Sequence, residues 1–200
     1  MKSKYHIADQ ADPGNLELEN QVSESQIVEA LLFSSQQSLT TQQISKITGI
    51  RKSQKIRQLV EELNKFYEGN NRAFFIEKVA GGYQLRIDSR FQKWIKKGRI
   101  VKPIQLSQSV METLSIIAYQ QPVTRAEIED IRTVDATYAL RTLLNKKLIR
   151  IIGRKEVMGR PLLYGSSKLF LEVFGFNSIS DLPRPEDFDI LSSPEEPEQI

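Results

Sequence analysis

The chain has 200 residues, of which 40% are hydrophobic and 26% charged, a composition typical of a globular protein that can bury a core. Cysteine is absent, which excludes disulfides, cysteine-ligated zinc and thiol nucleophiles. No apolar run reaches the ~18–20 residues of a membrane span, and the first residues lack the apolar core of a signal peptide. We therefore expect a cytoplasmic protein without membrane contact.

The two ends of the chain differ in charge from its middle. Residues 1–24 lack sustained apolar periodicity and are net acidic, and residues 181–200 hold seven acidic residues and one basic residue. We expect a flexible tail over 1–24 and an acidic, disordered tail over 181–200. The C-terminal tail is either a solubilising segment or a docking segment with Phe188, Ile190 and Leu191 as its apolar anchors. The basic middle is compatible with an acidic partner such as nucleic acid, or with a scattered positive surface.

Between the tails the sequence repeats itself. The segment that begins at Glu29 matches the segment that begins at Glu112, and the apolar and Gln/Thr positions then stay in register without a gap. The matched pairs include Gln36 with Gln120, Leu39 with Val123, Thr40 with Thr124, Ile44 with Ile128, Ile47 with Ile131, Ile50 with Val134, Ile56 with Leu140 and Leu59 with Leu143. Two copies of one unit are predicted.

In the first copy, Thr40 with Gln43 forms a capping box that opens a short helix. A longer helix is predicted from Ser53 to about Glu68, with its apolar face at Ile56, Leu59, Val60 and Leu63. The run FFIEKVAGGYQLRI then predicts a β-hairpin in which Gly81 and Gly82 supply the positive φ of the turn. A last short helix carries Phe91, Trp94 and Ile95.

The second copy follows the same order. Ser109 with Glu112 predicts a capping box for the first helix, and Pro122 ends that helix and makes Gln121 extended. Thr124 with Glu127 caps a helix through Ile131, and a third helix is predicted from about Asp135 to Lys147, with Leu140, Leu143 and Leu144 facing inward. The run LIRIIGRKEVMGRPLLYG predicts a hairpin with a longer tip, before a short helix with Phe170, Leu171 and Phe174.

Three helices followed by a hairpin form a winged helix-turn-helix. The predicted fold class is therefore α+β and mainly helical, with two tandem winged helix-turn-helix domains and flexible termini. The expected boundaries are 25–97 for the first domain, 98–106 for a basic linker and 107–180 for the second domain.

Residues for catalysis are missing from the expected folded part. The one histidine, His6, lies in the N-terminal tail, and neither GxxxxGK[ST] nor GxGxxG occurs. Glu127, Glu129 and Asp130 share one short helix, where capping and solvation explain them. We expect no enzyme, no catalytic residue, no cofactor and no metal.

The third helix of each copy separates two binding hypotheses. The first copy places Arg51, Lys52, Lys55 and Arg57 near the start of this helix, where a DNA reader would contact phosphates or bases. An ordinary solvated face explains these residues as well. The second copy has Asp135 at the equivalent place, which suits a protein partner better. The alternative to a protein-binding role is a tandem winged-helix transcriptional regulator that binds DNA.

The residues of the second copy resemble a known family. The run LSQSVMETLSIIAYQQPVTRAEIEDIRTV, followed by LIRIIGR, GRPLLYG, FLEVFGF and DLP, closely resembles segregation and condensation protein B. The resemblance is strongest from Leu106 to Pro183 and weaker but in register over the first copy. Two departures are Thr133, where the family usually has glycine, and Ser166–Ser167, where it usually has a threonine pair.

This resemblance implies a non-enzymatic subunit of the bacterial SMC condensin complex that acts in chromosome condensation and segregation during the cell cycle and cell division. It implies a homodimer formed by the first winged helix. It also implies binding to the kleisin, segregation and condensation protein A, which bridges the SMC ATPase heads. Contact with the SMC ATPase would be indirect, and contact with DNA indirect or weak. The protein would be cytoplasmic and associated with the nucleoid.

Ten residues of the second domain are candidates for kleisin contact on this basis. Four of them also have structural explanations: Pro122 ends a helix, Pro161 shapes the wing, and the rings of Tyr119 and Tyr164 close the core. Arg160 on the wing could hold a fork of donors toward a carboxylate or carbonyl. The ten candidates are Tyr119, Gln121, Pro122, Arg125, Arg132, Tyr138, Arg141, Arg160, Pro161 and Tyr164. Leu32 and Phe33 are candidates for dimerisation, although both also fit a core.

Overall fold

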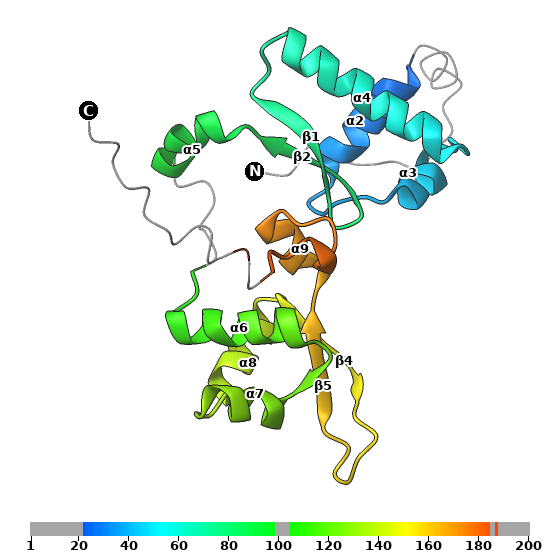
Figure 1. Cartoon of the computed structure of the whole chain (residues 1–200). Coiled ribbons are helices and arrows are strands. Elements are labelled where there is room, and N and C mark those ends of the chain that lie inside the picture. Colours follow the sequence, from blue (N-terminus) through cyan, green and yellow to red (C-terminus); the bar gives the residue numbers. More distant parts are fainter. Residues whose placement is uncertain (1–21, 99–104, 185–186, 188–200) are drawn as a thin grey trace, which may run out of the picture.

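A computed structural model describes residues 22–98, 105–184 and 187. Most of the expected tails over 1–24 and 181–200 and most of the expected linker over 98–106 lie outside these residues. Two units of similar construction follow one another, one above the other in Figure 1. We call residues 22–98 repeat 1 and residues 105–184 repeat 2.

The described elements of repeat 1 are α2 (Glu24–Ser34), α3 (Thr41–Thr48), α4 (Ser53–Gly69), β1 (Phe74–Val79), β2 (Gly82–Ile87), the 3-10 turn η1 (Ser89–Phe91) and α5 (Gln92–Gly98). Those of repeat 2 are α6 (Gln108–Gln120), β3 (Val123–Thr124), α7 (Arg125–Arg132), α8 (Thr137–Asn145), β4 (Ile149–Arg154), β5 (Leu162–Ser166), α9 (Lys168–Phe174) and η2 (Ile179–Asp181). This order confirms the predicted α+β fold with two winged helix-turn-helix units. Among the described residues, no helix has both the length and the apolar character of a membrane span.

Capping residues set the starts of the helices. The boxes of Thr40 with Gln43 and of Thr124 with Glu127 are both present, as predicted. The predicted box of Ser109 with Glu112 is wrong, because α6 begins at Gln108 and its N-cap, Ser107, makes no side-chain capping bond. Ser109 therefore lies inside the first turn, and its hydroxyl accepts a hydrogen bond from Arg132 Nη2 at 2.8 Å.

The ends of the helices are also set locally. Pro122 follows α6, and Gln121 is extended at φ −58° and ψ 139°, as predicted. The helix α8 is shorter than predicted at both ends. Its start is delayed because the Asp135 carboxylate accepts hydrogen bonds from the amide and hydroxyl of Thr137, and Lys147 leaves the helical region with φ 57°.

The wing of repeat 1 corrects the prediction about its glycines. The antiparallel register pairs Val79 with Gly82, and the two turn residues with positive φ are Ala80 and Gly81. Gly82 is needed for space, because a Cβ at that position would lie 2.6 Å from the carbonyl oxygen of Leu39. Leu39 and Tyr83 exchange two backbone hydrogen bonds of 2.9 and 2.8 Å, so Leu39 adds a third, one-residue strand.

The sheet of repeat 2 has the same plan in a longer form. Its strand order is β3-β5-β4, with Val123 paired to Tyr164, so Val123 takes the place that Leu39 takes in repeat 1. The β4-β5 wing is the longer one and projects away from the helices in Figure 1. The pairing of Leu39 with Val123 in the aligned sequences is therefore also a structural equivalence.

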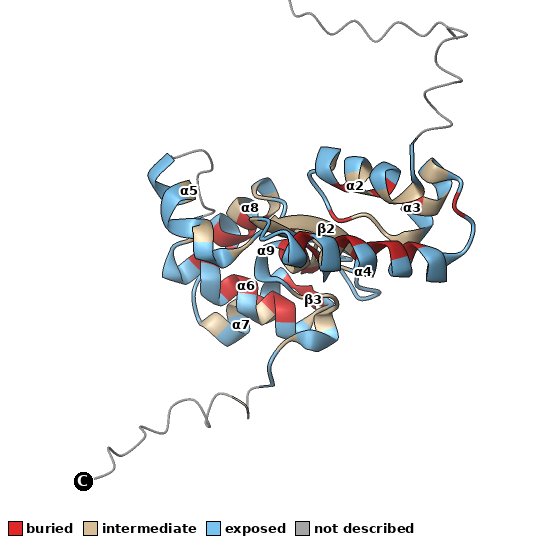
Figure 2. Cartoon of the chain, turned by 90° about the horizontal axis from the view of Figure 1, so that it is seen from above, coloured by how far each residue is buried: buried red, intermediate tan, exposed pale blue. Residues whose placement is uncertain are grey.

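Each repeat has its own hydrophobic core, coloured red in Figure 2. The core of repeat 1 contains Val28, Leu32, Ile44, Ile50, Ile56, Leu59, Val60, Leu63, Tyr67 and Ile76. The core of repeat 2 contains Val110, Leu114, Ile117, Ala118, Val123, Ile128, Ala136, Ala139, Leu140, Leu143, Leu148, Ile149, Tyr164 and Phe170.

The final helices of the two repeats pack differently. In α9, Phe170 is buried in the core of repeat 2. In α5, Trp94 is 65% exposed, and the helix packs against η1. The predicted helices both form, but the likeness between the repeats does not extend to their packing.

Candidate protein-binding surface

Exposed side chains gather on α7, α8 and the turn between them in repeat 2. Tyr138 is 73% exposed, Ile131 55% and Val134 54%. With Pro122, Arg125 and Arg141, which are also exposed, they form what we call the α7–α8 surface. Its aromatic, apolar and arginine side chains are the types enriched at the centres of protein interfaces.

Two shallow hollows flank α7. One is lined by Gln120, Pro122, Val123, Glu127, Asp130 and Ile131. The other lies between α8 and β5 and is lined by Arg125, Thr137, Leu140, Arg141, Leu144, Asn145 and Tyr164. Tyr164 is 8% exposed and forms the floor of the second hollow. A partner side chain could enter either hollow while the rest of its segment lies across α7.

Arg125 is held in place beside the second hollow. Its Nε donates to Glu129 Oε1 at 2.6 Å and its Nη2 donates to Asp135 Oδ2 at 2.7 Å. The hydrogen bond with Glu129 raises the pKa of Arg125, and the hydroxyl of Thr137 lowers the pKa of Asp135. Within the described residues Arg125 Nη1 has no hydrogen-bond acceptor, so it can donate to a carbonyl or carboxylate of a partner.

Glu127 has a structural role on the same helix. Its Oε2 accepts hydrogen bonds from the amide and hydroxyl of Thr124, and its Oε1 pairs with Lys155 of the wing. The Lys155 ammonium and the Thr124 donors lower the pKa of Glu127 to about 2. A carboxylate that is ionised and fully engaged is unsuited to general acid–base catalysis near neutral pH. Within the described ranges, no group of His, Asp or Glu side chains could hold a metal ion.

Five of the ten residues predicted to contact a kleisin lie at this surface or in its hollows: Pro122, Arg125, Tyr138, Arg141 and Tyr164. Gln121 instead ties elements of repeat 2 together. Its Oε1 accepts from the amide and hydroxyl of Ser166, and its Nε2 donates to the carbonyl of Ala118. Its side chain is thus engaged within the chain.

Arg132 is largely buried between α6 and α7. Its side chain is 7% exposed, and besides Ser109 it approaches Glu112 Oε2 at 3.7 Å. Its Nε and Nη1 atoms are buried and have no hydrogen-bond partner among the described residues. The guanidinium therefore faces the interior of repeat 2.

The remaining three candidates lie elsewhere. Tyr119 is on the far side of α6, where its hydroxyl donates to the carbonyl of Pro183 at 2.7 Å. Arg160 is in the wing turn with φ 39° and pairs with Glu156, and the Pro161 carbonyl accepts from the Lys155 amide. The wing residues shape the tip of the hairpin.

Residues 26–185 match the family described as segregation and condensation complex subunit ScpB. Segregation and condensation protein B of Syntrophotalea carbinolica is 41% identical over 170 residues, which are 85% of this chain and 86% of that protein. The chain belongs to the ScpB family. This agrees with the resemblance seen in the sequence of repeat 2.

Two solved structures are also similar to this ScpB-family chain. A conserved hypothetical protein from Chlorobium tepidum is 34% identical, with 80% of this chain and 99% of that chain covered and a TM-score of 0.37. A dimer of the ScpB N-terminal domain complexed with ScpA peptide is 22% identical, with 40% and 94% covered and a TM-score of 0.36. The family assignment rests on the sequence matches.

The two residues predicted for dimerisation in this ScpB-family chain lie in different surroundings. Leu32 is 1% exposed and belongs to the core of repeat 1, whereas its neighbour Phe33 is 76% exposed. Of the two, Phe33 has a side chain that a second chain could reach.

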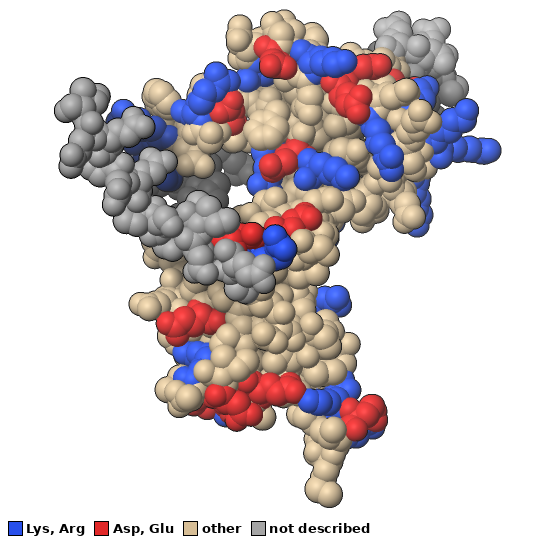
Figure 3. Space-filling view, viewed as in Figure 1, with Lys and Arg blue, Asp and Glu red and all other residues tan. Residues whose placement is uncertain are grey.

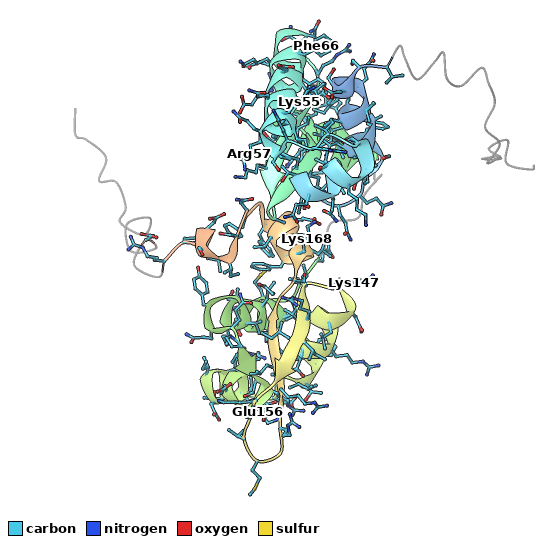
Figure 4. All side chains as sticks on the ribbon, turned by 90° about the vertical axis from the view of Figure 1, so that its right-hand side faces the viewer. Lys55, Arg57, Phe66, Lys147, Glu156 and Lys168 are labelled. Carbon is cyan, nitrogen blue, oxygen red and sulfur yellow. The ribbon has the colours of Figure 1, made fainter. Side chains whose placement is uncertain are left out.

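The four predicted phosphate contacts are all exposed. Arg51, Lys52 and Arg57 have no ion-pair partner within the described residues, and Lys55 pairs with Glu24. Figure 4 places Lys55 and Arg57 on α4. In Figure 3 most blue side chains lie on repeat 1, whereas red carboxylates line the edge of repeat 2 that α7 forms.

Sequence reasoning missed Ile131 and Val134 as surface residues. Both align with apolar residues of repeat 1, Ile47 and Ile50, which suggests a shared core position. Ile50 is 6% exposed, but Val134 is 54% exposed, and Ile47 is as exposed as Ile131. The repeat identifies apolar positions but cannot tell which of them remain open to a partner.

Proposed function

We propose that this ScpB-family chain is a non-enzymatic subunit of the bacterial SMC–kleisin complex. Two copies associate through repeat 1, and repeat 2 binds the kleisin, segregation and condensation protein A, through the α7–α8 surface. The SMC ATPase is then reached through the kleisin, and the protein acts in the cytoplasm, at the nucleoid. We also propose that 25–97 and 107–180 are separate winged-helix domains joined by 98–106, which the two hydrophobic cores support.

The observation that carries this proposal is the combination of Tyr138 with Arg125. Tyr138 is an exposed ring on α8. Arg125 on α7 is already fixed by two carboxylates, so it can bind a peptide with little loss of side-chain entropy. Apolar positions at Ile131 and Val134 extend the contact area on one side. A segment with an apolar side chain and a nearby carbonyl or carboxylate would satisfy both features.

Co-elution with a purified kleisin on a sizing column, with light scattering for mass, tests the proposal. We expect a stable complex for the parent chain. Tyr138→Ala should weaken it about tenfold or more, because a central interface aromatic contributes about 2 kcal/mol. Trp94→Ala removes another exposed ring, 65% exposed, from α5 and should leave the complex intact. A parent chain that does not co-elute with the kleisin would contradict the proposal.

The alternative is a DNA-binding transcriptional regulator. Arg51, Lys52 and Arg57, near the start of α4, support it, because they are exposed and have no ion-pair partner in the part of the chain that the structure describes. It predicts duplex binding that falls by roughly 10³ to 10⁵ between 50 and 200 mM salt for 6 to 10 phosphate contacts. Fluorescence anisotropy on a labelled duplex, measured over a salt series, distinguishes the two roles. Strong, salt-sensitive duplex binding without kleisin binding would favour the regulator.

A further inference from the structure

The two repeats meet at a buried carboxylate. Glu172 of α9, in repeat 2, is 6% exposed. Its Oε1 accepts hydrogen bonds from the amide of Ser38 at 2.9 Å and from the hydroxyl of Ser38 at 2.8 Å. Ser38 lies in the loop between α2 and α3 of repeat 1 and is 1% exposed. One oxygen of repeat 2 therefore satisfies two donors of repeat 1.

Two cations surround this contact. Lys168, one turn earlier on α9, donates to the carbonyl of Ser38 at 2.5 Å and lies 3.8 Å from Glu172 Oε1. Arg86 of β2 donates from Nη2 to the carbonyl of Glu172 at 2.5 Å, and its Nε pairs with Glu77. Figure 4 shows Lys168 on α9 at the level where the repeats meet. Each repeat thus supplies one cation to the junction.

The wing turn of repeat 1 makes a second set of contacts. The amide of Ala80 donates to the carbonyl of Phe176, and the amide of Gly81 donates to Asn177 Oδ1, both at 3.0 Å. These two residues follow α9 after its C-cap, Gly175. The contacts of Ser38, Arg86 and the wing turn come from three separate places in repeat 1, so they restrict rotation about any one of them.

The arrangement is energetically demanding because a buried carboxylate is costly unless it is hydrogen-bonded and paired. Glu172 meets this requirement only while the Ser38 loop stays in place. If the two repeats separate, Glu172 must replace its hydrogen bonds to Ser38 with hydrogen bonds to water, and Lys168 loses its bond to the Ser38 carbonyl. On the other side of α9, Phe170 is packed in the core of repeat 2. Because Glu172 and Phe170 belong to one helix, fixing Glu172 against repeat 1 also fixes the core of repeat 2 relative to repeat 1.

We propose that Glu172 is a positioning residue that fixes the angle between the two repeats. The angle in turn sets the separation between the α7–α8 surface and repeat 1, whichever molecule binds there. Removing the carboxylate should release the angle without unfolding either repeat.

The absence of cysteine allows a direct test by spin labelling. Nitroxides on Gln58→Cys of α4 and Ala126→Cys of α7, both exposed positions, report the distance between the repeats by double electron–electron resonance. The labelled chain is mixed with an excess of unlabelled chain, so that label pairs across a dimer do not contribute. We expect one narrow distance distribution for the parent full-length chain. Glu172→Ala should broaden it and shift it to longer distances. Glu172→Gln keeps an oxygen acceptor for Ser38 and should restore most of the narrow distribution.

Controls separate positioning from general stability. Glu61→Ala removes an exposed carboxylate from α4 and should leave the distribution unchanged. A second label pair, Gln108→Cys with Ala126→Cys, lies within repeat 2 and should stay narrow in every variant. If Glu172→Ala fails to fold, Ser38→Ala tests the same contact from repeat 1 and should broaden the distribution. An unchanged inter-repeat distance in a folded Glu172→Ala or Ser38→Ala chain would overturn the proposal.

Discussion

Gly49 and Thr133 hold the same left-handed position at the end of the second helix of each repeat. Gly49 has φ 76° at the end of α3, and Thr133 has φ 57° at the end of α7. Both donate their backbone amide to the carbonyl four residues earlier, Ser45 and Glu129 respectively. Glycine adopts this region without strain, whereas a β-branched residue places its Cβ too close to backbone. At this position the second repeat therefore contains local backbone strain, and the first repeat does not.

This difference predicts opposite effects for two exchanges. Thr133→Gly should stabilise the chain by about 0.5–1 kcal/mol, because relief of ~1–2 kcal/mol of left-handed strain exceeds the entropy that glycine loses on folding. Gly49→Thr should destabilise it by about 1 kcal/mol through the backbone alone, since no atom lies within 4 Å of a Cβ built there. Urea denaturation of both variants measures the two effects, and changes of the same sign would contradict this account.

The wing of repeat 1 yields a prediction about neighbouring glycines. Gly81 has φ 72° but open space around it, whereas a Cβ on Gly82 would meet the Leu39 carbonyl. Gly81→Asn should change stability by less than about 1 kcal/mol, because asparagine tolerates the left-handed region. Gly82→Ala should cost about 1–3 kcal/mol, because backbone must move to admit the methyl group. Thermal unfolding followed by circular dichroism ranks the two, and equal losses would refute the close-approach explanation.

The sequence predicts those features of the fold that depend on residues close together along the chain. The boxes at Thr40 and Thr124 are visible because the capping residues lie three positions apart on the chain. The role of Gly82 is not visible, because its neighbour Leu39 is distant in sequence. The junction at Glu172 is hidden for the same reason. Ser38 aligns with Pro122 of repeat 2, and nothing in the sequence shows that the amide and hydroxyl of Ser38 meet a helix more than a hundred residues later.

The candidate surface is predictable only in part. Residue type identifies Tyr138 and Arg125 as possible contacts, but it does not decide which face of a helix a long side chain takes. Arg132 illustrates this, since it turns inward toward Ser109 while Arg125, two turns earlier, stays exposed. Gln121 is likewise engaged by partners within the chain, whereas Tyr119 is 41% exposed although its hydroxyl donates to the Pro183 carbonyl. Exposure depends on packing between elements, which the spacing of residues along one helix cannot show.

The pairing of Glu127 with Lys155 predicts a dependence on pH. Because the folded pKa of Glu127 is lowered to about 2, the contribution of its charge is present above the unfolded value near 4.5 and is lost as the pH falls toward 2. Glu127→Gln keeps the capping geometry that Gln43 shows in repeat 1, and removes the charge. At pH 7 it should lower stability by about 0.5 kcal/mol, as expected for an exposed ion pair.

Melting temperatures of the parent and Glu127→Gln chains, compared at intervals from pH 7 to pH 2, check this expectation. The difference between them should shrink below about pH 4.5 and should also shrink in high salt, which screens exposed charges. Glu156→Gln removes the charge from another exposed wing pair, with Arg160, and serves as a control for net charge. A difference that stays constant across the whole range would rule out the Lys155 pair as its source.

Leu32 and Phe33 are adjacent on α2, but substitution of Leu32 should lower folding stability, whereas substitution of Phe33 should change the oligomeric state. Leu32→Ala opens a cavity in the core of repeat 1 and should cost about 2–5 kcal/mol of folding stability. Phe33→Ser removes an exposed ring, so stability should stay within about 0.5 kcal/mol of the parent. If repeat 1 forms the dimer through α2, Phe33→Ser shifts the chain to monomer in sedimentation equilibrium. Ile47 is an exposed apolar residue on α3, and Ile47→Ser is the matched control, which should keep the dimer. A chain that remains a dimer with Phe33→Ser would place the interface away from α2.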